Sequence, residues 1–233
     1  METPRVNRAA LTMAALGLVV GAAAWWPMLA GAEPAGPGAE LLAKAPALSR
    51  SGDGGALSRA VLAPVWGNDG TRPTIWRPAA TLLLSVESMA GGGATHGRVQ
   101  VILVLTAALL LGLIGRSLGG AGGEAAGLLF VAHASLADAV GDPAARAGML
   151  ALVCGLGAVL AWRRGADRAA LGLVALAGLS HEGALLLPLV VACAGREDEE
   201  ESSAGGRLGL AAAALLPVVL RGLVLGSLWP AAS

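Results

Sequence analysis

The chain has 233 residues, of which 55% are hydrophobic and 14% are charged, and its formal net charge at pH 7 is zero. Soluble domains carry about 25% charged residues, and the mean hydropathy here is +0.69, so the composition excludes an ordinary soluble domain. The zero net charge also excludes the basic field that nucleic-acid binding requires. The sequence predicts an all-α, polytopic integral membrane protein.

The cysteines and histidines give no sign of a disulfide framework or a metal site. Cys154 and Cys193 lie in apolar runs, which favours apolar packing. His96, His133 and His181 are far apart and lack the spacing of metal-ligand pairs. The sequence therefore predicts neither a metal nor a cofactor.

The first predicted element, residues 1–32, is an N-terminal membrane helix. Arg5 and Arg8 precede an uncharged run from Ala9 to Ala32, which is long enough to cross a hydrocarbon core of about 30 Å. Ala30-Gly31-Ala32 also fits a signal-peptide cleavage site. Under both interpretations Arg5 and Arg8 stay in the cytoplasm and the residues that follow are exported.

Residues 33–97 form a predicted extracytoplasmic loop that begins with a stretch rich in Pro, Gly and Ser. Within it, Pro78 suits the first turn of a helix over residues 77–90. Polar residues (Arg77, Thr81, Ser85 and Ser88) and apolar residues (Leu82, Val86 and Met89) follow opposite faces of that helix. The helix is too short to span, so the pattern predicts an interfacial helix.

Residues 98–229 hold the remaining predicted membrane helices, which with the N-terminal helix make about seven spans. Their apolar segments are Val99–Gly115, Ala125–Val140, Ala147–Ala161, Ala169–Leu179, Gly183–Ala194 and Leu208–Leu228. An interfacial helix over 77–90 puts Arg116 and the cluster Arg163, Arg164 and Arg168 in the cytoplasm, as the positive-inside rule requires. Trp162 then marks the inner membrane interface.

Two of these segments meet at Ser180-His181-Glu182-Gly183. They form either one long helix with His181 and Glu182 inside the membrane, or two short helices separated by a hinge. A charge at the bilayer centre costs about 3 kcal/mol and Gly183 offers a break, so the hinge is favoured. Residues 196–207, with their acidic run, then form a solvated cytoplasmic loop.

Polar groups also gather between two apolar segments, in the turn from His133 through Asp138 to Arg146. Ionisable groups at the mouth of a membrane hairpin point to function, although an ordinary hydrophilic turn is the alternative. The predicted topology places this turn, His96 and the hinge on the extracytoplasmic face. Arginine can hold phosphate bidentately and a carboxylate can deprotonate a hydroxyl, which indicates a site for an anionic, lipid-linked substrate.

The order of these motifs resembles the N-terminal half of GT-C glycosyltransferases. The nearest branch is the transmembrane, tetratricopeptide-containing protein O-mannosyltransferases. The similarity runs from Trp66 to about Gly226 through Trp66-Gly67-Asn68-Asp69, Trp76-Arg77-Pro78, His133 to Asp138 with Arg146, Leu179-Ser180-His181-Glu182 and Leu220-Arg221.

The resemblance implies transfer of a mannose-type sugar from a polyprenyl-phosphate carrier to an extracytoplasmic acceptor. It implies catalytic roles for Asp138 and for Glu33, which stands where the family has paired acidic residues. The residues expected to bind the substrate and its phosphate are Arg77, His133, Arg146, His181, Glu182 and Arg221. Arg221 also has the alternative of snorkelling to the interface.

Two other functions stay open at this point. A non-catalytic relative would bind a polyprenyl lipid or a membrane protein partner, such as a separate C-terminal half. A small transporter or scaffold would line a path with His133, Asp138, His181 and Glu182. In every case the predicted location is the bilayer, the inner membrane for a bacterial protein, with the N-terminus in the cytoplasm.

Overall fold

The structure is a computed structural model that describes residues 19, 23, 30, 76–90, 93–118, 123–133, 136, 140, 142–195 and 204–225. Its described residues form helices and no strands. Among them, three helices are long and apolar enough to cross a membrane: Thr95–Ser117, Pro143–Arg163 and Gly206–Leu225. The all-α class is therefore confirmed, and these helices support a membrane-embedded protein.

The full set of predicted spans is only partly covered by these helices. The run from Ala9 to Ala32 lies almost wholly outside the described residues. Helix α7 (Gly123–Ala132), helix α10 (Asp167–Ser180) and the apolar helix Glu182–Cys193 are shorter. The 14 residues of α10 extend about 21 Å, less than a hydrocarbon core. The seven-span topology stays a prediction.

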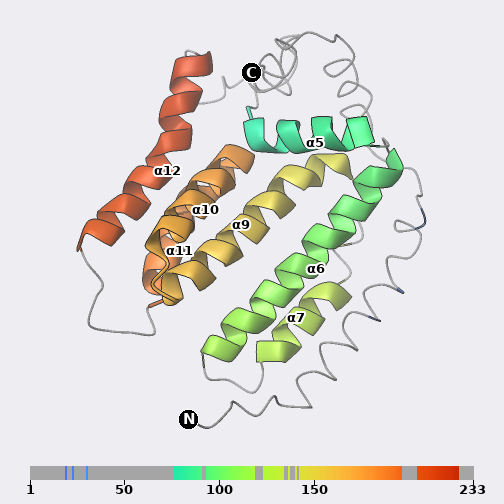
Figure 1. Cartoon of the computed structure of the whole chain (residues 1–233), viewed down its shortest axis with the longest axis horizontal. Helices are drawn as coiled ribbons and strands as arrows, with labels where there is room; N and C mark the ends of the chain where they lie inside the picture. The colour runs from blue at the N-terminus through green and yellow to red at the C-terminus, as the bar shows by residue number, and fades with distance from the viewer. Residues whose placement is uncertain are drawn as a thin grey trace.

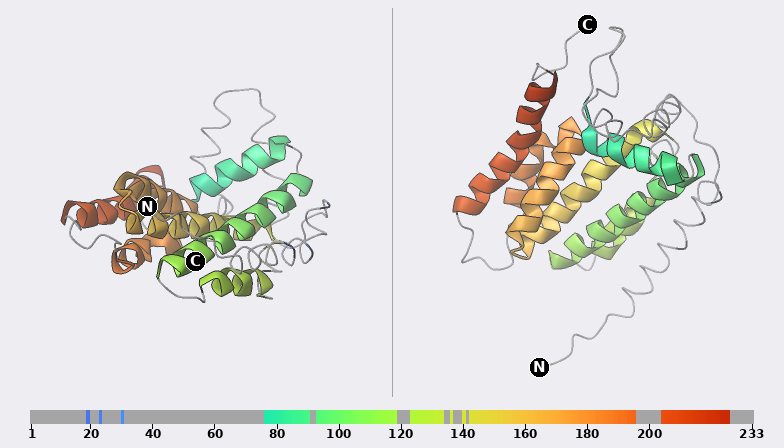
Figure 2. Two further views of the ribbon diagram at one scale, coloured as in Figure 1. Left: turned by 60° about the horizontal axis from the view of Figure 1, so that its bottom comes forward. Right: turned by 45° about the horizontal axis from the view of Figure 1, so that its top comes forward.

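The long helices lie side by side in a bundle that one short helix crosses. Helix α9 (Arg146–Arg163) packs between α6 (Gly93–Ser117) and α10, with α7 beyond α6 and α12 (Ala204–Leu225) beyond α10 (Figure 1). Helix α5 (Pro78–Ala90) lies across the ends of α6, α9 and α10 (Figures 1 and 2). We call this end of the bundle the α5 end.

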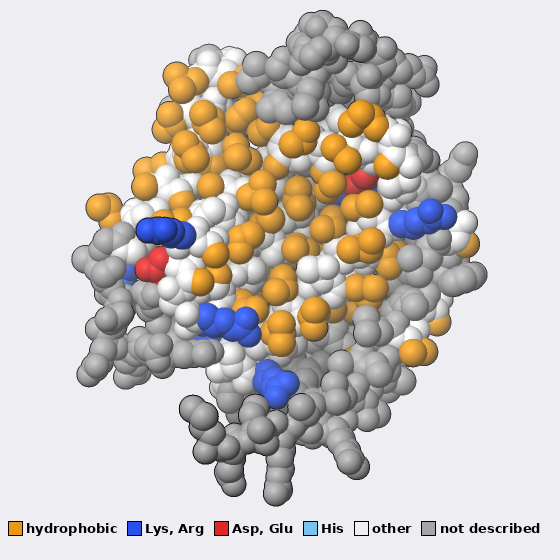
Figure 3. Space-filling view, in the orientation of Figure 1, with side chains coloured by type: hydrophobic (Ala, Val, Ile, Leu, Met, Phe, Trp, Pro, Cys, Tyr) orange, Lys and Arg blue, Asp and Glu red, His pale blue; other side chains and the backbone are white. Residues whose placement is uncertain are grey.

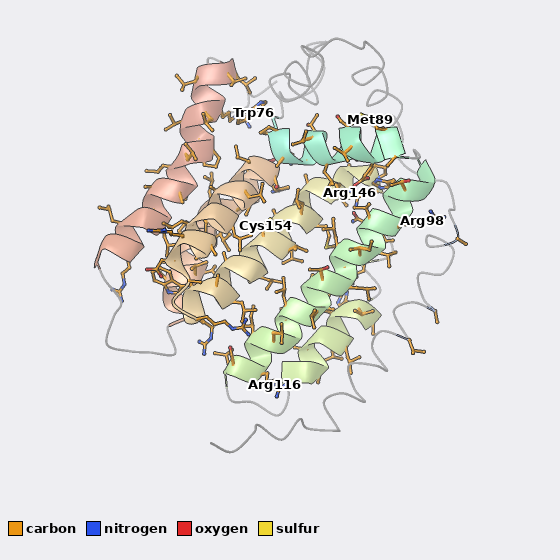
Figure 4. All side chains as sticks on the ribbon, viewed as in Figure 1. Trp76, Met89, Arg98, Arg116, Arg146 and Cys154 are labelled. Atoms are coloured by element: carbon orange, nitrogen blue, oxygen red, sulfur yellow. The ribbon has the colours of Figure 1, made fainter. Side chains whose placement is uncertain are left out.

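The opposite end, which we call the arginine end, carries the basic residues Arg116, Arg163, Arg164, Arg168 and Arg207. Figure 4 shows Arg116 at the end of α6 that is far from α5. Helix α12 starts here as well, because a Cβ added at Gly209 would lie 3.2 Å from the Leu171 side chain. Farther along the same pair of helices, a Cβ at Gly178 would lie 2.6 Å from Pro217, so glycine permits this close approach.

Arg163 ties helix ends together at the arginine end. Its Nε donates to Ser117 Oγ at 2.9 Å, and its Nη2 donates to the Ser117 carbonyl at 3.0 Å. Its Nη1 donates to the Ala194 carbonyl, 2.6 Å away, at the end of α11 (Leu187–Cys193). Carbonyls at helix C-termini carry partial negative charge, so these bonds stabilise a guanidinium that is only 9% exposed.

The predicted hinge between α10 and α11 is confirmed. Helix α10 ends at Ser180, His181 is extended (φ −155°, ψ 133°), and the 3₁₀ helix η2 (Glu182–Leu186) follows. Because the Ala194 carbonyl accepts a hydrogen bond from Arg163, α11 runs back toward the arginine end. The break differs from the expected one in its cause: the His181 side chain accepts the Gly183 N–H at 3.0 Å, and Gly183 is not among the glycines with positive φ.

Trp162, which was expected at the inner membrane interface, is buried among helices. It is 1% exposed and belongs to a hydrophobic core cluster with Val174, Val191 and Leu210, which come from α10, α11 and α12. An interface anchor would need an exposed ring. The prediction failed because neighbouring helices cover the last turn of α9.

The outer surface of the bundle is apolar. Large hydrophobic side chains are more than half exposed on α6, α7 and α12, among them Leu109, Leu129, Leu215 and Leu223. Figure 3 shows hydrophobic side chains over much of the described surface on one face. Such a surface is typical of a protein that contacts another apolar phase, here the lipid of a membrane.

The predicted helix over 77–90 is present as α5, and some of its apolar side chains face outward while some polar ones face the bundle. Leu82, Val86 and Met89 are exposed, whereas Ser85 and Glu87 are buried against the bundle. An exposed apolar stripe suits a helix at a membrane interface, and that placement stays a prediction.

Candidate functional site

Six of the eight predicted site residues lie in the described part of the chain. Glu33 and Asp138, the expected catalytic carboxylates, lie outside it. The others form no single site. Instead, the α5 end has two groups, a surface cluster of Arg77, His181 and Glu182 and a buried cluster of Glu87, His96, Gln100 and Arg146.

The surface cluster joins the start of α5 to the hinge. Pro78 begins α5, which fixes Arg77 just before its first turn. Arg77 donates from Nε to Glu182 Oε2 at 3.0 Å and from Nη2 to Glu182 Oε1 at 2.7 Å. This is the bidentate geometry that arginine forms with carboxylates and phosphates. The side chains are 16% and 49% exposed, respectively, so solvent reaches the pair.

His181 lies beside this ion pair, with Nε2 3.2 Å from Arg77 Nη2. Its Nδ1 accepts the Gly183 N–H, so the neutral ring carries its proton on Nε2. In that tautomer Nε2 and Nη2 are both donors, and their contact is a close approach rather than a hydrogen bond. Burial and the positive charge of Arg77 lower the pKa of His181 more than Glu182 raises it, which favours the neutral ring.

Glu182 is held in its ionised form. Burial by itself raises the pKa of this carboxyl, but the hydrogen bonds from Arg77 and from its own backbone N–H, with the charge of Arg77, lower it to about 2. At neutral pH Glu182 is therefore a counter-ion and not a proton donor. It occupies the Nε and Nη2 edge of Arg77, which a bound phosphate would have to share or take.

The buried cluster connects three helices through Arg146, the first residue of α9. Its Nη1 donates to Gln100 Oε1 at 2.6 Å, and its Nη2 donates to Glu87 Oε2 at 2.7 Å and to the His96 carbonyl at 2.8 Å. Glu87 comes from α5, and His96 and Gln100 come from α6. Figure 4 shows Arg146 where these helices meet.

The His96 ring completes this cluster. Its Nδ1 lies 2.7 Å from Arg146 Nη2 and 3.1 Å from Glu87 Oε2. The two hydrogens of Arg146 Nη2 go to Glu87 Oε2 and the His96 carbonyl, so Nδ1 carries the proton of the neutral ring and donates it to Glu87 Oε2. Within the described residues, Glu87 Oε1, His96 Nε2 and Arg146 Nε have no hydrogen-bond partner. His96 is 0% exposed, so it does not open to the surface as the sequence suggested.

Burial decides what Arg146 can do in this arrangement. Its side chain is 0% exposed and its charge is balanced by Glu87, whose side chain is 2% exposed. A phosphate cannot reach this guanidinium unless helices separate. The geometry thus gives Arg146 a role in holding α5 on α6 and α9, and leaves Arg77 as the arginine of the two clusters with access to a ligand.

His133 and Arg221 are not brought into one site. His133 is exposed and follows α7, whereas Arg221 is partly buried in α12, and these helices lie at opposite edges of the bundle (Figure 1). Two partners of Arg146, Glu87 and Gln100, were not among the site residues predicted from the sequence. Glu87 could have been found from the sequence, because it is the one charged residue of α5.

The described residues contain no group of three His, Cys, Asp or Glu side chains placed to hold a metal ion. No protein-family model matches the chain, and comparison with curated proteins and with solved structures found no similar protein.

Proposed function

We propose that the chain is a GT-C-type membrane glycosyltransferase, or the N-terminal part of one, that binds the phosphate of a polyprenyl-phosphate sugar at the α5 end. One observation carries the proposal: Arg77 and Glu182, which belong to two of the resembling motifs, form a bidentate pair across 105 positions of sequence. His181, from the second motif, lies against the same guanidinium.

The proposed reaction assigns separate tasks to these residues. Arg77 binds the phosphate of the carrier, and Glu182 orients Arg77 until the phosphate takes its place. The bond between the sugar C1 and the phosphate oxygen breaks, a bond from C1 to the acceptor hydroxyl oxygen forms, and polyprenyl phosphate leaves. The hydroxyl proton goes to a carboxylate, for which Asp138 and Glu33 are the candidates.

The membrane orientation is part of the proposal. The arginine end faces the cytoplasm, because Arg116, Arg164, Arg168 and Arg207 are exposed there and cytoplasmic loops carry an excess of arginine. The α5 end then faces the extracytoplasmic side, with α5 at the outer interface and the N-terminus in the cytoplasm.

The complete burial of Arg146 favours a second candidate function. The resemblance implies that this residue binds the carrier phosphate, yet Arg146 is 0% exposed and is paired with Glu87. A non-catalytic relative, which binds a polyprenyl lipid or a partner membrane protein without sugar transfer, needs no phosphate at Arg146.

Sugar transfer in membranes that contain the chain separates the two functions. Labelled polyprenyl-phosphate-mannose and polyprenyl-phosphate-glucose are offered as donors to the wild type and to Asp138→Asn, Arg77→Gln and Arg98→Gln. Arg98 is an exposed arginine of α6 outside the surface cluster, so Arg98→Gln is the matched control.

An enzyme predicts transfer that is abolished in Asp138→Asn, falls on the order of 10²-fold in Arg77→Gln, and persists in Arg98→Gln. Polyprenyl phosphate that copurifies with the wild type but not with Arg77→Gln, in the absence of transfer, would select the non-catalytic function. If the folded protein shows no sugar transfer and no bound lipid, both candidate functions are rejected.

A further inference from the structure

Helix α5 is attached to the bundle by an arginine–glutamate pair near each of its ends. Arg77 and Glu182, at its start, have side chains that are 16% and 49% exposed. Glu87 and Arg146, near its end, have side chains that are 2% and 0% exposed. The same chemistry is thus used twice, once within reach of solvent and once away from it.

Between the two pairs, the hydroxyl groups of α5 bond within the helix itself. Thr81, Ser85 and Ser88 each donate to the backbone carbonyl four residues earlier, at 2.8–3.0 Å. The contact of this middle part with the bundle includes the small and apolar side chains of Ala80 and Leu84, which are buried. The two ion pairs add to this burial, one at each end of α5, and at the start of the helix Trp76 and Pro78 are buried as well.

The two attachments respond differently to a competing anion. Water and ligands reach the exposed pair and can replace one partner, whereas separating the buried pair leaves a charge without solvent. A phosphate offers two oxygens to the Nε and Nη2 edge of Arg77, as Glu182 does. Ten residues of helix separate the pairs by about 15 Å, enough for one end of α5 to move while the other stays.

We propose that α5 is a strap whose fixed point is the Glu87–Arg146 pair and whose releasable end is the Arg77–Glu182 pair. A phosphate group that takes Arg77 from Glu182 frees the first turn of α5 from η2. The strap rests on the proposed function in one respect, the binding of phosphate at Arg77. Its consequence is that ligand binding exposes the end of α10, where Ser180 is buried in the paired state.

Distances between spin labels test the strap in the full chain. One pair of labels, at Leu82→Cys on α5 and Leu186→Cys on η2, reports on the releasable end. A second pair, at Met89→Cys on α5 and Ile102→Cys on α6, reports on the fixed end. All four native side chains are exposed. In the proteins that carry either label pair, Cys154 is replaced by alanine and Cys193 by serine.

The probes are inorganic phosphate, nanodiscs of phosphatidylcholine, and the same nanodiscs with a polyprenyl phosphate. The strap predicts that the Leu82–Leu186 distance of the ligand-free protein loses population by about two- to fivefold when phosphate binds, while the Met89–Ile102 distance stays the same. A response to the polyprenyl phosphate alone identifies the lipid as the source of the phosphate. A response to the inorganic ion shows that the phosphate group is sufficient.

A variant pair tests the strap without any ligand. Glu182→Gln should give the long Leu82–Leu186 distance in the absence of phosphate, whereas Asp167→Asn, which neutralises a carboxylate of α10 at the arginine end, should leave it unchanged. Unchanged distances in Glu182→Gln, or an equal change at the Met89–Ile102 pair, would overturn the strap.

Sugar transfer measured on the same preparations keeps the two proposals apart. Label distances that change without any transfer would contradict the enzyme and leave the strap standing. Transfer that depends on Arg77, with distances unaffected by Glu182→Gln, would contradict the strap and leave the enzyme standing.

Discussion

The α5 end and the arginine end of the bundle are both tied by a buried arginine, but the two guanidinium groups have different acceptors. Arg146 is 0% exposed and donates to the carboxylate of Glu87 as well as to neutral groups. Arg163 is 9% exposed and donates to one hydroxyl and to carbonyls at two helix ends. The acceptors of the fully buried guanidinium thus include a full negative charge, and those of the one near the surface include carbonyls with partial charges at helix ends.

Breaking the Glu87–Arg146 pair gives the largest expected effect. Glu87→Ala leaves Arg146 buried without its counter-ion, which should lower the free energy of unfolding by about 3–5 kcal/mol. The measurement is unfolding of the purified protein in detergent. The double variant Glu87→Leu/Arg146→Leu should lose less than Glu87→Ala, because no charge remains buried. Equal or greater loss in the double variant would show that the pair is not the source of the cost.

Removing the tie at the arginine end should have a smaller effect. Arg163→Leu deletes charged hydrogen bonds to Ser117 and Ala194, and hydrogen bonds to charged groups contribute about 1.5–3 kcal/mol. Arg164→Leu is the control, since Arg164 is exposed at the same end. Thermal unfolding of both variants beside the wild type measures the difference. If the two substitutions cost the same, the capping bonds of Arg163 do not hold this end.

The exposed Arg77–Glu182 pair should give the smallest effect, one that depends on pH. The pKa of Glu182 is lowered from 4.5 to about 2 in the folded protein. The unfolded state therefore takes up a proton first as the pH falls, so the stabilisation from the pair is complete above pH 4.5 and is lost toward pH 2. Because Glu182 is 49% exposed, we expect a loss below about 1 kcal/mol.

A comparison of unfolding between pH 6 and pH 2.5 in the wild type and in Glu182→Gln isolates this contribution. The stability difference between the two proteins should shrink as the pH falls through the window set by Glu182. A difference that stays constant over this window would mean that the ionised carboxylate does not stabilise the fold.

Local signals in the sequence predicted α5 and the hinge well. Pro78 marks the start of a short amphipathic helix, and the helix found ends at Ala90, as expected. The polar group at Ser180 to Gly183 predicted a break between two apolar segments, and α10 ends at Ser180. These features depend on residues near one another in the chain, so sequence patterns can reveal them.

Contacts between distant residues were beyond such patterns. The partners of Arg146, Glu87 and Gln100, lie 59 and 46 positions away, and no periodicity reports that distance. Helix α6 begins at Gly93, before the predicted boundary at residue 98 between the loop and the bundle, which stays a prediction. His96 and Gln100 interrupt the apolar pattern, yet both are buried as part of the Arg146 cluster.

At the arginine end, helix α12 begins at Ala204, so its first turn, with Gly205, Gly206 and Arg207, overlaps the predicted loop of residues 196–207. Residues 196–203, with the acidic run, lie outside the described part of the chain, so the solvated loop stays a prediction. Apolar windows locate helix centres and leave polar first turns out.

The imidazole that ends α10 makes the hinge resistant to acidification. The turn into η2 requires an unprotonated Nδ1 on His181, since that atom accepts the Gly183 N–H. Burial and Arg77 lower the pKa of His181, so the ring stays neutral at a pH where an ordinary histidine takes up a proton. A protein that faces a mildly acidic exterior would thereby keep the geometry of this bend, and the position of Glu182 beside Arg77, while the medium around it changes.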